Sequence, residues 1–164
     1  MPATPADLAR RLERLAIETS TVEHPALFTV GESRALRGRI AGAHCKSLFL
    51  KDNKGAPWLV VALEDALLDL KALPGLIGSH RLSFASADTL MAALGVAPGS
   101  VTPFALINDT ACRVTVVLDR TMLEHRLLNY HPLVNTMTTA IAAGDLLAFI
   151  RDCGHEPLIV ALSR

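Results

Sequence analysis

The chain has 164 residues, 51% of them hydrophobic and 20% charged, which suits one folded domain and excludes a disordered chain. Lysine plus arginine and aspartate plus glutamate number 16 each, so the chain lacks the overall basic field of a general DNA or RNA binder. This charge balance still permits a local basic patch that binds one end of an RNA.

The N-terminal segment predicts an amphipathic helix. Thr4 is placed as the N-cap, Pro5 at the first helical position and Asp7 in the first turn, while Leu8 and Leu12 recur at helical spacing. The segment is polar where a secretory signal peptide needs an apolar stretch. No apolar run approaches the roughly 18 residues of a membrane span. We therefore expect a cytoplasmic protein without membrane contact.

The next part of the chain predicts an irregular strand, a short helix and a β-hairpin. Residues 20–30 are β-branched and interrupted by a proline, and residues 31–40 have a short helical pattern. Residues 44–51 and 57–63 predict the two hairpin strands, joined by the turn sequence at 52–55. The second strand is apolar throughout, which predicts that both of its faces are covered.

Three more helices are predicted downstream. One lies in residues 65–78 and ends near residues 74–75. The second has Ser86 as its N-cap and Gly95 as its C-cap, and the third is closed by Gly154.

Strand patterns alternate with these helices, which predicts a mixed α/β or α+β domain with a largely antiparallel sheet. The last strand is expected to be buried. These strands are expected within residues 81–86, 112–119, 127–142 (with a tight His131–Pro132 corner) and 158–162.

Lys46 is the first candidate for a functional residue. Alternation along residues 44–51 places it in line with Leu48 and Leu50, and places Ser47 on the opposite face. Burial of an unpaired ammonium group is costly. Lys46 therefore either reaches solvent from a strand end or lies in a polar pocket, and the pattern allows both.

A loop and a histidine are further candidates. Gly99 to Pro103 (GSVTP) could expose backbone N–H groups to a ligand oxygen, but the loop lacks the Gly-Lys-Ser/Thr ending of a Walker loop, and an ordinary turn is the alternative. His131 and His24 each precede a proline, and either ring could simply cap a corner.

The cysteines offer little chemistry. Cys45, Cys112 and Cys153 are odd in number and widely spaced, which argues against a disulfide framework and for a reducing compartment. Neighbouring His44 and His155 do not complete a zinc-ligand spacing, and no Gly-x-Ser-x-Gly motif occurs. We expect no metal, no cofactor and no cysteine or serine nucleophile. No reaction can be inferred from these residues by themselves.

Three long segments together resemble a known family. HCKSLFLKDNKGAPWLVVAL (44–63), RLSFASADTLMAALGVAPGSVTPFALIND (81–109) and HPLVNTMTTAIAAGDLLAFIRDCGHEPLIV (131–160) resemble YbaK/prolyl-tRNA synthetase-associated editing domains, and more closely the freestanding PrdX-type proteins. The resemblance implies that residues 1–164 are one domain with a curved, barrel-like sheet flanked by helices. It implies a deacylase that hydrolyses mischarged tRNA in trans, with alanyl-tRNA(Pro) as the first expectation. The implied partners are the tRNA acceptor end and prolyl-tRNA synthetase, without DNA or a cofactor.

The resemblance also implies roles for single residues. Lys46 matches the family's essential lysine and would act electrostatically, while Gly99 and Ser100 would offer backbone N–H groups to the developing oxyanion. His131 would help to shape the amino-acid pocket, and Asp109 belongs to a segment that supports the site. The remaining implied substrate-binding residues are Ser47, Val101, Thr102, Pro103 and Asn108.

Two features leave alternatives open. Alanine-specific members usually carry asparagine after the lysine, whereas this chain has Ser47, so serine or 2-aminobutyrate is an alternative substrate residue. A non-catalytic module that binds tRNA or a synthetase is a further alternative. Arginines near the N-terminus could form an acceptor-stem patch or a solvated face: Arg10, Arg11, Arg14, Arg34, Arg37 and Arg39.

Overall fold

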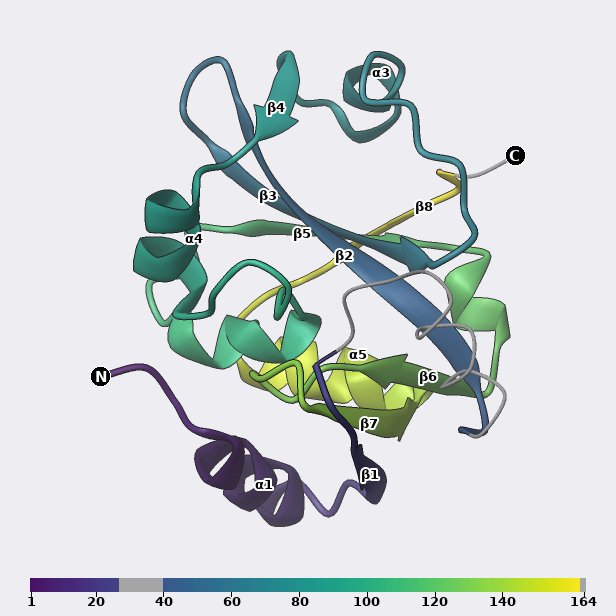
Figure 1. The fold of residues 1–164 in the computed structure, drawn as a ribbon. Helices are drawn as coiled ribbons and strands as arrows, with labels where there is room; N and C mark the ends of the chain where they lie inside the picture. The colour runs from purple at the N-terminus through teal and green to yellow at the C-terminus, as the bar shows by residue number, and fades with distance from the viewer. Residues whose placement is uncertain (27–39, 163–164) are drawn as a thin grey trace.

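The computed structural model describes residues 1–26 and 40–162 (Figure 1). Within these residues, eight strands form one sheet in the order β1-β7-β6-β2-β3-β5-β8, with β4 beside β2. The strands are β1 (Thr19–Glu23), β2 (Ala43–Asp52), β3 (Pro57–Leu63), β4 (Leu82–Phe84), β5 (Thr115–Asp119), β6 (Leu127–Tyr130), β7 (Met137–Ala142) and β8 (Leu158–Val160). The helices are α1 (Pro5–Arg14), α3 (Leu73–Ile77), α4 (Ala87–Leu94), α5 (Ala143–Asp152) and the 3-10 helices η1 (Pro103–Asn108) and η2 (Met122–Glu124).

The sheet mixes both kinds of pairing. Antiparallel pairing joins β1 to β7, β7 to β6, and β2 to both β3 and β4. Parallel pairing joins β2 to β6, β3 to β5 and β5 to β8. The mixed α/β class is therefore confirmed. The sheet is less antiparallel than expected, because β5 and β8 both run parallel to β3.

The hairpin of β2 and β3 lies between two apolar cores. Leu59 and Val61 face the main core together with Phe49, while Val60 and Leu50 face a smaller core to which α3 contributes. The three β3 side chains are fully buried, which confirms the prediction from the apolar second strand. Figure 1 shows α3 beside β4 at one end of the molecule and α1 beside β1 and β7 at the other.

The predicted helix caps are confirmed. The Thr4 hydroxyl accepts the Asp7 N–H, and the Asp7 carboxylate accepts the Thr4 N–H, which makes a reciprocal capping box. The Ser86 hydroxyl accepts the Thr89 N–H at the start of α4. Gly95 ends α4 with a φ of +67°, a left-handed conformation that favours glycine.

Two predictions were wrong in detail. The helix expected to end near Pro74 instead spans Leu73–Ile77 with Gly78 as its C-cap, because a proline fits the first turn, where its missing N–H has no helical acceptor. The last strand is not buried, since Leu158 is 41% and Ile159 36% exposed. Among the strands of residues 1–26 and 40–162, β8 pairs with β5 alone and forms an edge of the sheet.

Part of the N-terminal prediction lies outside the described residues. β1 occupies the first part of the irregular strand expected in residues 20–30, whereas most of the short helix expected in residues 31–40 is not described. No helix in the described ranges has the length and apolarity needed to cross a membrane.

Gly95→Ala should destabilise the fold by about 1–3 kcal/mol, because a non-glycine residue in the left-handed region is strained. The new Cβ would also lie 2.7 Å from the Asn108 amide nitrogen. Gly144→Ala is the matched control, since its Cβ would meet no atom within 4 Å and alanine favours the helix. Urea unfolding midpoints measure both variants, and equal midpoints would contradict the assigned role of Gly95.

Candidate active site

Pairing is interrupted along one edge of β2. β6 pairs with residues 43–44 of β2, and β4 pairs with residues 50–52. Between these two contacts, no strand of the described chain pairs with this edge, although β3 pairs along the other. Lys46 and Ser47 lie in the gap.

Lys46 lies on the face of β2 that carries the smaller core. It shares a face with Leu50, which belongs to the smaller core, and with Leu48, which packs against that core. The half-buried Lys46 ammonium donates a hydrogen bond to the Ala66 carbonyl oxygen. Within residues 1–26 and 40–162 it has no carboxylate partner. The cation is therefore available to an anionic or carbonyl oxygen of a ligand.

Lys46 and His131 follow neighbouring residues of β2 and β6. The parallel pairs of β2 and β6 are followed one residue later by Cys45 and Tyr130, whose side chains interact. Lys46 is the next residue of β2, whereas His131 directly follows the end of β6 and begins the connection to β7. Half-buried Ser47 points to the face opposite that of Lys46, where the main core lies.

His131 is held by its own strand connection. Its Nδ1 lies 2.9 Å from the Met137 carbonyl oxygen, so Nδ1 carries the proton and Nε2 is an acceptor in the neutral ring. The ring centroid lies 6.2 Å from that of His24. Burial lowers the pKa of His131, the hydrogen bond to Met137 opposes this shift, and the nearby His24 lowers the pKa further.

The loop of residues 99–103 combines an unusual backbone with buried side chains. Gly99 has a φ of +90°, and the Ser100 N–H donates to the Ala97 carbonyl oxygen at 3.0 Å. Ser100 and Thr102 are buried, and the Thr102 hydroxyl accepts the Phe104 N–H at the start of η1.

Packing anchors this loop near the β6–β7 connection. Val101 packs against the main core and Pro103 is buried at the start of η1. A Cβ on Gly99 would lie 3.6 Å from the Asn135 amide nitrogen. The loop thus lies against the connection that also carries His131. Sequence analysis missed Asn135, whose only signal was a polar residue shortly after the His-Pro corner.

Asn108 and Asp109 have structural contacts. The Asn108 amide accepts the Ala3 N–H and donates to the Leu94 carbonyl oxygen, both at 2.8 Å. The buried Asp109 carboxylate accepts the Val114 N–H at 2.9 Å and lies 2.8 Å from Nε2 of buried His155. These contacts fix the end of η1, and they occupy groups that a substrate would otherwise contact.

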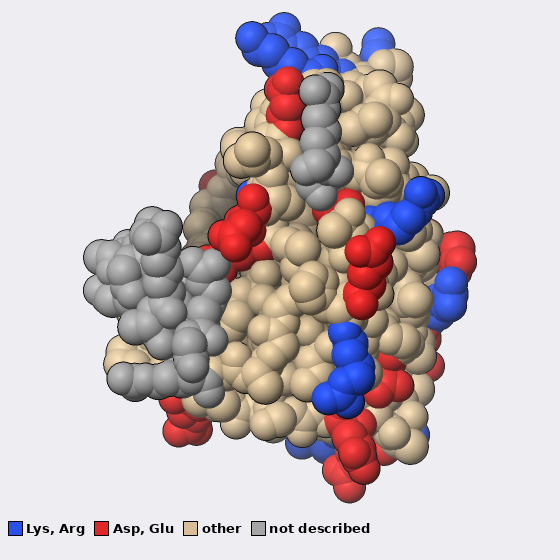
Figure 2. All heavy atoms as spheres, turned by 90° about the vertical axis from the view of Figure 1, so that its right-hand side faces the viewer, with Lys and Arg blue, Asp and Glu red and all other residues tan. Residues whose placement is uncertain are grey.

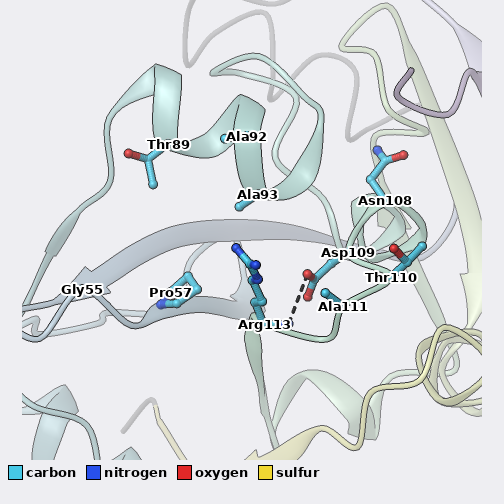
Figure 3. A pocket seen from close by; sticks show the side chains of 10 residues that line it. All are labelled: Gly55, Pro57, Thr89, Ala92, Ala93, Asn108, Asp109, Thr110, Ala111 and Arg113. Carbon is cyan, nitrogen blue, oxygen red and sulfur yellow. Dashed lines mark hydrogen bonds between the residues drawn. The ribbon is translucent and has the colours of Figure 1, made fainter.

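A pocket lies beside Asn108 and Asp109 (Figure 3). It measures about 420 Å³ and lies between the hairpin turn, α4 and the segment before β5, with the Arg113 side chain extending toward Ala93. Lys46, Gly99 and His131 do not line it. A second hollow of about 530 Å³ is lined by Ala66, whose carbonyl oxygen accepts the Lys46 hydrogen bond, but Lys46, Gly99 and His131 do not line this hollow either.

Half of the arginines expected to form a basic patch lie next to acidic side chains, and the other half are not described. On α1, Arg10 pairs with Asp7, and Asp152 lies 3.0 Å from Arg11 and 4.0 Å from Arg14. Figure 2 shows basic and acidic side chains interspersed over the face that it presents. The other three arginines of the expected patch, Arg34, Arg37 and Arg39, lie outside the described residues.

The cysteine thiols are poorly suited to nucleophilic chemistry. Burial raises the pKa of Cys45 and that of Cys153 each to about 11, so both remain protonated at neutral pH. Cys112 is exposed. In the described part of the chain, no three His, Cys, Asp or Glu side chains are grouped as a metal site would require.

The fold and these motifs agree with comparisons to known proteins. Residues 24–149 match the family model described as the aminoacyl-tRNA editing domain, and the chain belongs to this family. It is 40% identical over 160 residues to bovine prolyl-tRNA synthetase associated domain-containing protein 1, covering 94% of this chain and 93% of that protein. It is 35% identical over 156 residues to the prolyl-tRNA editing protein ProX of Acetoanaerobium sticklandii, covering 94% of each.

The fold itself recurs in solved structures. A crystal structure assigned as a candidate trans-editing enzyme for prolyl tRNA synthetase superposes with a TM-score of 0.71 at 22% identity, covering 98% of both chains. The predicted family resemblance and fold class are thereby confirmed.

The lowered pKa of His131 predicts a pH-dependent stability. As the pH falls through about 6.5, the unfolded imidazole binds a proton more readily than the folded one, so the free energy of unfolding should decrease below that pH. His131→Asn removes this titration. Urea unfolding from pH 7.5 to 5.5 should therefore show a steeper loss for the wild type than for the variant, and parallel curves would refute the assignment.

Proposed function

We propose that this chain is an aminoacyl-tRNA deacylase, a carboxylic ester hydrolase that acts in trans on mischarged tRNA. Membership of the editing-domain family supports this proposal, as does the similarity over nearly the whole chain to a protein named for prolyl-tRNA editing. We also propose that residues 1–164 form one editing domain. In support, the main core joins Leu8 of α1 with Ile150 of α5.

The observation that carries the proposal is the half-buried Lys46 ammonium in the gap of the sheet, without a carboxylate partner among the described residues. An aminoacyl ester is already activated, so the enzyme need only place a water molecule or the neighbouring ribose hydroxyl and stabilise the developing oxyanion. A fixed cation can hold the terminal phosphate or the ester carbonyl. Lys46 is thus proposed to act by position and charge, and the raised thiol pKa of Cys45 speaks against the adjacent cysteine as nucleophile.

The first proposed substrate is alanyl-tRNA(Pro). A synthetase pocket made for a larger residue rejects a smaller one poorly, because missing methylenes change binding by only about 1–3 kcal/mol. A second site that admits alanine and excludes proline solves this problem by size. The half-buried His131 ring is proposed as part of the excluding wall. Ser47 lies on the other face, and serine or 2-aminobutyrate stays an alternative substrate residue.

The proposed partners are the acceptor end of tRNA(Pro) and, second, prolyl-tRNA synthetase. Ion pairing of the α1 arginines weakens the case for a strong local patch on that helix. Binding should then be weak and transient, which suits an enzyme that samples many tRNAs.

Incubation with alanyl-tRNA(Pro) and prolyl-tRNA(Pro) tests the substrate proposal. Alanine should be released at least about tenfold faster than proline, since one site must discriminate by size. Seryl and 2-aminobutyryl esters belong in the same panel because of Ser47. If no ester in the panel is hydrolysed while tRNA binding persists, the chain is a non-catalytic binding module and the enzymatic proposal is wrong.

Lys46→Ala should lower the deacylation rate about 100-fold or more, as expected when a charge that stabilises the transition state is removed. Lys51→Ala is the matched control, because Lys51 lies on the same strand with an exposed side chain. Single-turnover rates with saturating enzyme separate this effect from weaker binding. A Lys46→Ala variant with the wild-type rate would remove the proposed role of Lys46.

A further inference from the structure

Ester hydrolysis needs hydrogen-bond donors for the carbonyl oxygen as it becomes negative, and the following inference rests on the function proposed above. Such donors are most effective when they are fixed in place and have no other acceptor. The loop of residues 99–103 was expected to supply two of them from its backbone. In the structure, one of these two backbone N–H groups already has an acceptor.

The Ser100 N–H is already engaged. It donates to the Ala97 carbonyl oxygen at 3.0 Å, which closes the turn that precedes the loop. The Gly99 N–H has no acceptor in the described part of the chain. One backbone donor therefore stays available at the glycine.

Asn135 lies beside Gly99 and carries a side-chain amide that could serve as the second donor. Its amide nitrogen is 3.6 Å from the position that a Cβ on Gly99 would occupy. The side chain is half-buried and, among the described residues, forms no hydrogen bond. It belongs to the connection between β6 and β7, which begins at His131. A neutral amide with free donor hydrogens thus faces the glycine from the segment that carries the proposed pocket wall.

Glycine at position 99 serves this arrangement in two ways. Its φ of +90° is a conformation that residues with a side chain rarely adopt. The missing Cβ also leaves space between the loop backbone and the Asn135 amide, space that a side chain would fill. The absence of a side chain therefore leaves room for a ligand atom beside the Asn135 amide.

We propose that Asn135 is a catalytic residue whose Nδ2 amide, together with the Gly99 N–H, binds the ester carbonyl oxygen of the substrate. Attack of a water oxygen on the carbonyl carbon moves the carbonyl π-electron pair onto this oxygen and releases one water proton to solvent. When the tetrahedral intermediate collapses, the bond from carbon to the ribose oxygen breaks, and that oxygen takes up a proton. The products are the free amino acid and tRNA with a free terminal hydroxyl.

Two variants of Asn135 test the proposal. Asn135→Ala removes the donor, and Asn135→Asp keeps the shape but replaces the donor by an acceptor at neutral pH. Both should lower kcat about 100- to 1,000-fold, as observed when one oxyanion donor is removed, while KM changes less than about threefold. Thr136→Ala, at the exposed neighbouring residue, is the matched control and should retain the wild-type kcat. Urea unfolding midpoints establish that the variants fold.

The outcomes separate this inference from the proposed function. An active wild type with both Asn135 variants within threefold of its kcat overturns the role of Asn135 and leaves the deacylase proposal intact. A loss confined to KM, with kcat preserved, also overturns it, since a donor to the oxyanion acts on the transition state. A wild type that hydrolyses no aminoacyl ester overturns the proposed function and this inference with it.

Discussion

The structure depends on how a cation is accommodated in a strand that is covered on both faces. Lys46 lies in β2 between an apolar main core and a smaller apolar core, where an uncompensated charge would be strongly destabilising. The fold resolves this conflict by interrupting the sheet. Neither β6 nor β4 pairs with β2 at Lys46, and the Lys46 ammonium donates a hydrogen bond to the Ala66 carbonyl oxygen.

The connection that follows β6 is fixed by the main core. Parallel pairing of β2 with β6 ends after two residues, and β6 then turns away at His131. The Leu133 N–H closes this corner onto the His131 carbonyl oxygen. Leu133 is buried in the main core, against which Val101 of the glycine loop also packs. Hydrophobic burial thus anchors the corner after β6 and the glycine loop on the same core.

The polar side chains of Asn108 and Asp109 fix the end of η1. Asn108 ties the end of η1 to the N-terminal segment and to the end of α4, and Asp109 ties it to His155 and to the start of β5. Leu133 has a φ of +73°, which costs about 1–3 kcal/mol for a residue with a side chain. Its burial offsets that strain. A rigid surrounding of this kind is what a site needs if its donors are to keep their positions.

Local sequence patterns determined much of the secondary structure of this protein. Alternation and turn residues predicted the hairpin and the face of Lys46, and capping residues predicted the ends of α1 and α4, because these features depend on neighbours within a few positions. The motif segments predicted the family for a different reason, since their order and spacing are themselves a sequence property.

Only the tertiary structure decided which polar groups are free. The Ser100 N–H and the Asn108 amide are taken up by contacts with Ala97 and with Ala3 and Leu94, whereas Asn135 lies against Gly99 without a hydrogen bond in the described chain. The exposure of β8 was likewise set by its place at the sheet edge. Sequence spacing could not predict these outcomes, because hydrogen-bond partners and strand neighbours that are far apart along the chain are chosen by packing in three dimensions.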